Sequence, residues 1–160
     1  MIFVCVGSRK FQFNRLIEKI DELVGAGFIK DEVFAQTAAT TYIPKYIESK
    51  PYLSSDEFRL YQSRADLIIT HGGTGAMLGA LKLGKQVIAV PRLFKYGEHS
   101  DDHQTQVAGV LENQGYLRCV LDVDELLETI ERLEKNPIEK KYTNPSQVVS
   151  IIEQFIMKGS

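Results

Sequence analysis

The chain has 160 residues, of which 44% are apolar and 25% charged, so it can form one domain with a sizeable hydrophobic core. Its 19 basic and 21 acidic residues give a net charge of −2, which leaves no basic surplus to neutralise a nucleic-acid backbone. Its apolar runs, such as Val87–Val90, are far shorter than the ~20 residues that a membrane-spanning helix needs. Composition therefore argues against a dedicated nucleic-acid binder and against a membrane-spanning chain.

The amino terminus predicts a buried strand rather than a signal peptide. No positive charge precedes its apolar run, Ile2–Val6, and the run is short. Cys5 and Cys119 each fall inside a predicted strand, which suits two reduced thiols in the core of a cytoplasmic protein. We therefore expect the protein to be cytoplasmic.

Short apolar runs alternate with helical patterns along the chain. In chain order, the first half predicts a strand at Ile2–Val6, a helix at Asn14–Gly25, a strand at Glu32–Gln36, a short strand within Lys50–Leu53 and a helix at Ser55–Arg64. The second half predicts a strand at Leu67–Thr70, a helix at Thr74–Leu83, a strand at Gln86–Val90, a helix at Asp102–Asn113, a strand at Leu117–Leu121, a helix at Val123–Leu133 and a last helix at about 145–157. Asn14 and Asp122 are the predicted N-caps of their helices.

This alternation predicts an α/β fold with a doubly wound parallel sheet, Rossmann-like, in a single domain over residues 1–160. Right-handed crossovers place helices on both faces of such a sheet, and ligands bind at the carboxyl ends of its strands. Residues directly after strands are therefore the candidates for function.

A glycine-rich loop follows the strand Leu67–Thr70 and leads straight into a helix. Its residues are His71, Gly72, Gly73, Thr74 and Gly75. Glycines let backbone amides approach a ligand closely, and a helix start offers unpaired N–H groups with partial positive charge. The loop thus predicts an anion site, most naturally for phosphate, with the His71 ring as a further donor. The alternative is a glycine-rich turn that serves only tight packing of helix on strand.

Two familiar phosphate motifs do not fit this loop. A Walker loop needs Gly-Lys-Ser/Thr, which is absent after the glycines. The dinucleotide fingerprint needs a third glycine where Leu78 stands, and the first strand is followed by the lone Gly7. An NAD-binding role is therefore disfavoured.

A long polar loop, Pro91–Gln104, follows the next strand. It carries aromatic, cationic, carboxylate, imidazole and amide side chains, and such a mixture can pair with the hydroxyls and C–H faces of a sugar. The alternative is a solvated surface loop. His99 and His103 have a spacing that can chelate a metal, but Ser100 stands where the zinc-protease motif has Glu, so no metal is expected.

Three segments together resemble the carboxyl-terminal, donor-binding domain of family 28 glycosyltransferases, over nearly the whole chain. The segments are Thr70–Gly75, Leu83–Pro91 and Asp102–Gln104. The family includes the peptidoglycan N-acetylglucosaminyltransferase and the soluble subunit of the dolichol-linked N-acetylglucosaminyltransferase. The bacterial capsular and exopolysaccharide branch is the most similar to the amino-terminal residues Val4–Gly7 and Phe13–Leu16 and to the run from Pro91 to Gln104. The soluble subunits of that branch resemble β-1,4-galactosyltransferases acting on lipid-linked glucose.

The resemblance implies the donor-binding half of a GT-B glycosyltransferase that transfers a hexose from a UDP-sugar in capsule or exopolysaccharide synthesis, with galactose as the favoured hexose. It implies that His71 and the amides of the glycine loop hold the donor diphosphate, and that Gln104, with Asp102 or His103, contacts the transferred sugar. Gly7 and the loop after it would border the nucleotide. Arg92 and Glu98 complete the expected donor site.

One position departs from the family pattern. Many members carry Glu eight residues after the histidine, where it accepts the ribose hydroxyls, and Gly79 stands there in this chain. The functional reading is that ribose is held differently, for example by Glu98. The simpler reading is that Gly79 permits close helix packing.

Inverting transfer needs a general base for the acceptor hydroxyl and positive charge at the leaving diphosphate. His71 and the helix start would supply that charge, so no divalent cation or other cofactor is expected. Glu98, His99 and Asp101 are the candidate bases within the chain.

Two-domain members of such families carry the acceptor site in an amino-terminal domain, for which these 160 residues leave no room. The resemblance therefore implies a membrane-anchored partner subunit that binds a lipid-linked saccharide acceptor and recruits this chain to the inner face of the plasma membrane. The alternative function is a non-catalytic nucleotide-sugar-binding or enhancer subunit of such a complex. An epimerase-like enzyme is disfavoured, because it would need a second domain.

Overall fold

The structure is a computed structural model that describes residues 1–142 together with residues 150 and 153. Its centre is a six-stranded parallel sheet in the order β3-β2-β1-β4-β5-β6. The strands are β1 (Ile2–Cys5), β2 (Val33–Gln36), β3 (Glu48–Lys50), β4 (Leu67–His71), β5 (Gln86–Val90) and β6 (Arg118–Cys119). This topology confirms the predicted doubly wound parallel sheet.

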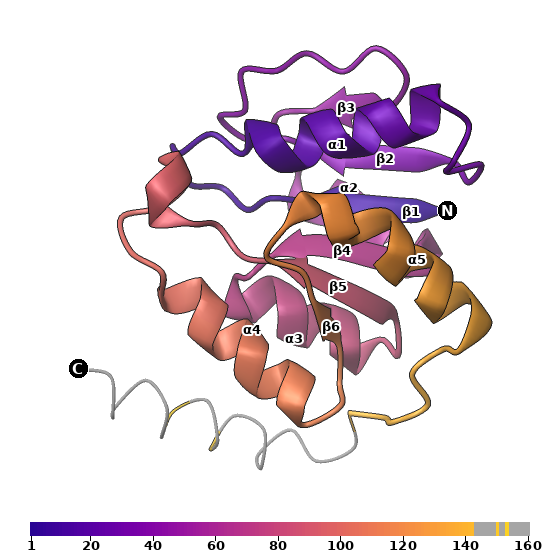
Figure 1. Ribbon diagram of the computed structural model, residues 1–160, viewed down its shortest axis with the longest axis vertical. Coiled ribbons are helices and arrows are strands. Elements are labelled where there is room, and N and C mark those ends of the chain that lie inside the picture. The colour runs from indigo at the N-terminus through magenta and orange to yellow at the C-terminus, as the bar shows by residue number, and fades with distance from the viewer. Residues whose placement is uncertain (143–149, 151–152, 154–160) are drawn as a thin grey trace.

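Helices connect the strands and cover both faces of the sheet (Figure 1). They are α1 (Asn14–Gly25), α2 (Ser55–Arg64), α3 (Thr74–Lys82), α4 (His103–Asn113) and α5 (Leu126–Lys135), with 3₁₀ turns η1 (Phe94–Tyr96) and η2 (Val123–Glu125). Most predicted boundaries agree with these within two residues. The helix predicted at about 145–157 lies outside the described residues. Within the part of the chain that is described, no helix is long and apolar enough to cross a membrane.

The apolar side chains form a layer on each face of the sheet. Along β1, Ile2 and Val4 point toward α1 and α5, whereas Phe3 and Cys5 point toward α2, α3 and α4. Burial raises the pKa of the Cys5 thiol to about 11, so this thiol stays protonated in the core. Strands buried on both faces explain why their sequences are almost continuously apolar.

Two sequence-based expectations need correction. Asn14 is the first residue of α1 rather than its cap, because its side-chain Oδ1 accepts from the backbone N–H groups of Thr41 (2.9 Å) and Tyr42 (3.0 Å). It therefore fastens the loop after β2 to the start of α1. The strand expected within Lys50–Leu53 is instead β3, an exposed three-residue edge strand that an apolar pattern does not reveal.

The strand order also determines where a ligand site can form. β1 and β4 are neighbours, but β1 leads to α1 on one face and β4 leads to α3 on the other. The two connecting loops therefore diverge at the carboxyl edge of the sheet and leave a crevice between them.

Candidate functional site

A pocket of about 350 Å³ opens at the carboxyl edge of the sheet. Three segments that are distant in sequence form it: the loop after β1, the loop between β4 and α3, and the end of the β5–α4 loop with the start of α4. Its lining residues are Arg9, His71, Gly72, Gly73, Thr74, His99, Ser100, Asp101, His103, Gln104 and Val107. The structure thus brings together most of the residues predicted from the glycine loop and the polar loop.

The His71 ring lies against the backbone of two glycines. A Cβ atom built on Gly7 would lie 2.6 Å from His71 Nε2, and one built on Gly73 would lie 2.3 Å from the same atom. Gly7 also has a φ of +81°, which other residues rarely adopt. At these two positions close packing does require glycine, and the packing brings the imidazole to the wall of the pocket.

His71 is uncharged near neutral pH. Burial lowers its pKa to about 4, the positive charge of Arg92 adds to this effect, and a hydrogen bond with the backbone of Cys5 opposes it. The ring Nδ1 lies 3.3 Å from Thr70 Oγ1. A neutral imidazole carries a single N–H, which the Cys5 backbone engages, so His71 can donate to a ligand when the ligand's own charge draws a second proton onto the ring.

Helix α3 begins at the pocket without a side-chain cap. Its N-cap is Gly73, and its first turn holds no acidic residue. The backbone N–H groups at the start of the helix therefore face the pocket with their partial positive charge uncompensated by a side chain. Together with His71, this helix start is suited to an anion.

Arg92 and Glu98 lie beneath the pocket and do not line it. Both residues have 0% exposure. The Arg92 guanidinium donates to backbone carbonyls, including Val6 at 2.6 Å, and the Glu98 carboxylate accepts from Arg15 Nε and Nη2, each at 3.0 Å. The expectation that they contact the donor, and that Glu98 serves as a base or holds ribose, is therefore corrected, because both side chains are fully buried and absent from the pocket lining. Of their side-chain nitrogen and oxygen atoms, Arg92 Nε alone has no hydrogen-bond partner among the described residues.

Asp102, Gln104 and Gly79 also have internal contacts. Asp102 Oδ1 accepts from the backbone N–H of Phe94 (2.9 Å), and Asp102 lines a neighbouring hollow beside η1. Gln104 Oε1 accepts from the backbone N–H of Arg92 (3.2 Å), so this amide orients the loop while lining the pocket. A Cβ on Gly79 would lie 3.3 Å from Gln62 Nε2, which places Gly79 against α2.

His99 and Asp101, the remaining candidate bases, line the pocket. His99 is 8% exposed, and its ring centre lies 5.8 Å from that of Phe11 with the two planes tilted by 32°. Its Nδ1 lies 3.4 Å from Asp101 Oδ1 and accepts from the Asp101 backbone N–H at 3.3 Å. His103 follows at the first turn of α4, where Asp101 Oδ1 accepts from its backbone N–H (2.8 Å). Neighbouring groups therefore hold this rim of the pocket in place.

The residue that sequence reasoning missed is Arg9. It is exposed and lines the pocket opposite the glycine loop. The signal was available, because Gly7-Ser8-Arg9-Lys10 places two cations directly after β1, where loops of a parallel sheet bind ligands. Arg9 adds an exposed guanidinium to a pocket that the helix start already makes attractive to anions.

The polar residues at the carboxyl edge do not form a metal site. Asp122 and Asp124 are two residues apart, but Asp122 Oδ1 accepts from the Asp124 backbone N–H (2.9 Å) and Asp124 pairs with Lys19 (3.2 Å). Among the described residues, no group of three or more histidine, cysteine and acidic side chains could hold a metal ion.

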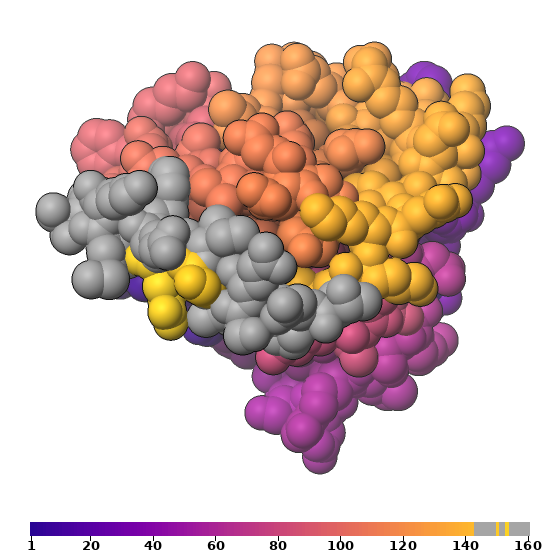
Figure 2. Space-filling model, turned by 90° about the horizontal axis from the view of Figure 1, so that it is seen from below, coloured from indigo at the N-terminus to yellow at the C-terminus, as the bar shows by residue number. Residues whose placement is uncertain are grey.

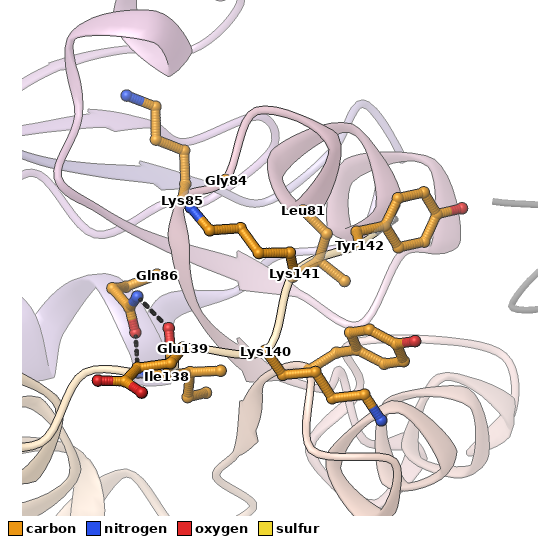
Figure 3. A pocket seen from close by; sticks show the side chains of 10 residues that line it. Leu81, Gly84, Lys85, Gln86, Ile138, Glu139, Lys140, Lys141 and Tyr142 are labelled. Atoms are coloured by element: carbon orange, nitrogen blue, oxygen red, sulfur yellow. Dashed lines mark hydrogen bonds between the residues drawn. The ribbon is translucent and has the colours of Figure 1, made fainter. Parts of the chain in front are cut away.

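A second pocket, of about 240 Å³, lies at the opposite edge of the sheet, between the start of β5 and residues 138–142 (Figure 3). There the Gln86 side chain exchanges two hydrogen bonds with the backbone of Ile138, at 2.8 and 3.0 Å. Lys85 and Lys140 extend in different directions, and their ammonium groups donate to the carbonyls of Ser63 and Gln114. The segment thus packs beside α4 (Figure 2), where Lys140 Nζ also lies 4.5 Å from the centre of the Tyr116 ring.

Comparison with known proteins identifies relatives of this chain. The profile of the family described as glycosyltransferase family 28 C-terminal domain matches residues 1–156. The UDP-N-acetylglucosamine transferase subunit ALG13 of Kluyveromyces lactis is 34% identical over 88 residues, which are 54% of this chain and 43% of that protein. The subunit of the same name from Yarrowia lipolytica is 33% identical over 72 residues, 45% of this chain and 35% of that protein. The chain thus spans less than half the length of these curated relatives.

Solved structures share the fold. An NMR solution structure of ALG13 has a TM-score of 0.61 at 18% identity and covers 97% of this chain and 96% of that chain. The calicheamicin glycosyltransferase CalG4 has a TM-score of 0.57 at 18% identity, over 96% of this chain and 37% of that chain. The Streptomyces sp. SF2575 glycosyltransferase SsfS6, complexed with thymidine diphosphate, has a TM-score of 0.57 at 15% identity, over 98% and 37%. These likenesses confirm the Rossmann-like α/β fold that GT-B glycosyltransferases share.

Proposed function

Because this chain belongs to the glycosyltransferase family 28 C-terminal domain family, we propose that it is the catalytic donor-binding subunit of an inverting glycosyltransferase with a UDP-sugar donor. The observation that carries the proposal is the uncapped start of α3 beside His71, at the carboxyl edge of the sheet. That start is suited to the diphosphate of a nucleotide-sugar.

In the proposed reaction the acceptor hydroxyl attacks the anomeric carbon of the sugar, and the nucleoside diphosphate leaves with an added negative charge. The amides at the start of α3, together with Arg9 and His71, would stabilise this charge more strongly as it grows. His71 is neutral in the free protein and would gain a proton as the phosphates approach, which would give it a second N–H to donate. In this scheme no metal ion is needed for the leaving group.

The acceptor site is proposed to lie on a second protein. The relatives named ALG13 are described as subunits of a transferase, which supports a heteromeric enzyme. The partner would be membrane-anchored, bind a lipid-linked saccharide and bring this chain to the inner face of the plasma membrane. It would either supply the general base or leave that role to His99 and Asp101 at the rim of the pocket.

The transferred sugar is proposed to be a hexose, with galactose favoured by the resemblance of the amino terminus and the polar loop to the capsular and exopolysaccharide branch. N-acetylglucosamine is the competing donor, because the ALG13 relatives are described as UDP-N-acetylglucosamine transferase subunits. A non-catalytic enhancer subunit is the second candidate function. Gly79, in place of the family's ribose-binding glutamate, favours it.

Calorimetric titration of the purified chain with UDP, with GDP and NAD as controls, tests the donor site. We expect saturable UDP binding that His71→Ala removes and that Arg9→Ala weakens roughly tenfold, since one charge-assisted contact contributes about 1.5–3 kcal/mol. Lys10→Ala is the matched control, because Lys10 is also exposed but does not line the pocket. Equal affinity for all three ligands would contradict a UDP site.

Turnover separates the two candidate functions. With the partner and a lipid-linked saccharide present, His71→Ala should lower kcat by orders of magnitude if this chain is catalytic. A loss of less than about threefold, in a variant that no longer binds UDP, would favour the enhancer role. Running the assay with UDP-galactose and UDP-N-acetylglucosamine in parallel identifies the donor.

A further inference from the structure

Three charged residues beneath the pocket, Arg92, Glu98 and Arg15, form one connected group, called here the Arg92 cluster. Arg92 and Glu98 are fully buried, and the Arg15 side chain is 14% exposed. The three come from the β5–α4 loop and from α1, and they contact each other through Glu98. The donor site proposed above does not use them as ligand contacts, so their conspicuous burial has to be explained in another way.

Arg92 holds both ends of the loop after β1. Its Nη2 donates to the carbonyl of Val6 (2.6 Å), and its Nη1 donates to the carbonyls of Phe11 (3.0 Å) and Gln12 (3.2 Å). These carbonyls bracket the segment that carries Gly7 and Arg9. The guanidinium also lies 4.9 Å from the centre of the Phe13 ring. One planar side chain thus determines the path of one wall of the pocket.

The same guanidinium holds the opposite wall. Arg92 Nη1 donates to the Glu98 carbonyl (3.1 Å), and the Glu98 carboxylate accepts from the Leu93 backbone N–H (2.9 Å), which closes the β5–α4 loop on itself. Arg15 fixes this loop to α1, because it donates to Glu98 and, through Nη2, to the carbonyl of Pro91 (3.2 Å). The loop continues directly into His99 and Asp101 at the rim of the pocket.

Stability alone is a weak explanation for such a group. Burying charged groups carries a large desolvation cost, and well-packed apolar residues often give an equally stable core. Geometry is a better explanation, because only a planar fork with several N–H groups can bind carbonyls of two loops at once. The cluster holds two guanidinium groups and one carboxylate, which pairs with Arg15, so a net positive charge also remains beside the anion pocket.

We propose that Arg92 and Glu98 are positioning residues that set the width of the donor pocket by joining its two flanking loops. The proposal rests on the proposed function for its ligand, UDP, but its geometry is independent of that function. Arg92 acts through the carbonyls of the Arg9 loop, and Glu98 acts through the fold of the loop that ends at His99. Neither residue touches the ligand.

Arg92→Lys tests the proposal, because it keeps the charge and removes the planar fork. We expect UDP to bind at least tenfold more weakly and amide hydrogen exchange to accelerate in residues 7–12 and 93–101. Glu98→Gln, which keeps the shape and removes the charge, should give a smaller change in the same direction. Should Arg92→Lys fail to fold, the partly exposed Arg15→Lys provides a milder disturbance of the same cluster.

Asp21→Asn is the matched control. Asp21 is also buried, at 1% exposure, and also fixes a loop, since its carboxylate accepts from Tyr42 Oη (2.7 Å) and from the backbone N–H groups of Lys45 (2.9 Å) and Tyr46 (2.8 Å). That loop does not line the pocket. We expect Asp21→Asn to lower the thermal midpoint while changing the UDP dissociation constant by less than twofold.

The outcomes are distinct. Unchanged UDP affinity and unchanged exchange in Arg92→Lys would overturn the proposal, as would an equal loss of UDP affinity in Arg92→Lys and Asp21→Asn at matched thermal midpoints. Absence of UDP binding by the unaltered protein would count against the proposed function instead. The exchange measurement then decides alone: acceleration confined to the two loops supports the positioning role, and uniform acceleration overturns it.

Discussion

Helices α2 and α3 both begin at the carboxyl edge of the same sheet, and they begin in opposite ways. Ser54 caps α2: its Oγ accepts from the Glu57 backbone N–H (3.1 Å) and the Glu57 carboxylate accepts from the Ser54 backbone N–H (3.1 Å). Helix α3 starts at Gly73 with no side-chain cap. The capping box leaves fewer free amides at the start of α2 than remain at the start of α3, and this difference is consistent with the anion site proposed at α3.

The charged groups at the starts of α2 and α3 differ as well. Asp56 and Glu57 compensate the dipole in the first turn of α2, and hydrogen bonding to the Ser54 backbone, with the ammonium group of Lys50, lowers the pKa of Glu57. At α3 the nearest titratable group is His71, held neutral by burial. The positive end of α3 thus remains available for an anion that arrives from solution.

Gly73→Ala, which fills the tight space between Gly73 and the His71 ring, should have the largest effect on UDP affinity. In Gly73→Ala the new methyl group would meet the His71 ring at 2.3 Å, so the ring or the helix start must move. We expect UDP affinity to fall roughly a thousandfold, or about 4 kcal/mol, by calorimetry. Gly109→Ala in α4 is the control, because a Cβ there meets nothing within 4 Å. Wild-type affinity in Gly73→Ala would show that the His71 geometry does not matter for binding.

The buried neutral His71 should make stability depend on pH. The unfolded chain takes up its proton near pH 6.5 and the folded protein only near pH 4, so between these values the unfolded state binds more protons. Stability should therefore fall as pH decreases through this window, by about 3 kcal/mol from this residue. Urea unfolding of wild type and His71→Ala from pH 7 to 4 measures the contribution of His71 to this pH dependence. Parallel curves for the two proteins would contradict the buried neutral state.

Removing the cap of α2 should have the smallest effect and only on stability. Ser54→Ala deprives one backbone N–H of its acceptor and should lower the free energy of unfolding by about 1 kcal/mol. UDP affinity should stay within a factor of about two, because no residue of α2 lines the pocket. A marked loss of UDP affinity would mean that the two helix starts are coupled and that the comparison between them fails.

The fold and the position of the candidate pocket were largely predictable from sequence. Alternating apolar runs and helical patterns predicted the parallel sheet, and the glycines after β4 marked the loop that lines the pocket. Local signals are strong for such features, because glycines and apolar periodicity depend on near neighbours in the chain.

The roles of Arg92 and Glu98 were not predictable in this way. In a polar loop, an arginine and a glutamate are typical of a solvent-facing or ligand-facing surface. Arg92 is bonded to carbonyls of Val6 and Phe11 and Glu98 to Arg15, partners more than 80 residues away in the chain that only the folded arrangement brings close. Asn14 was misjudged for the same reason, because its acceptor role depends on Thr41.

The free edge of the sheet at β3 bears on the behaviour of the protein in concentrated solution. An unpaired edge strand exposes N–H and C=O groups that a second copy could extend into a continuous sheet. In β3 the exposed Glu48 and Lys50 flank a single serine, and Pro51 follows without an N–H to donate. The strand is too short, too charged and too abruptly ended to act as a template, and this guards the chain against edge-to-edge aggregation.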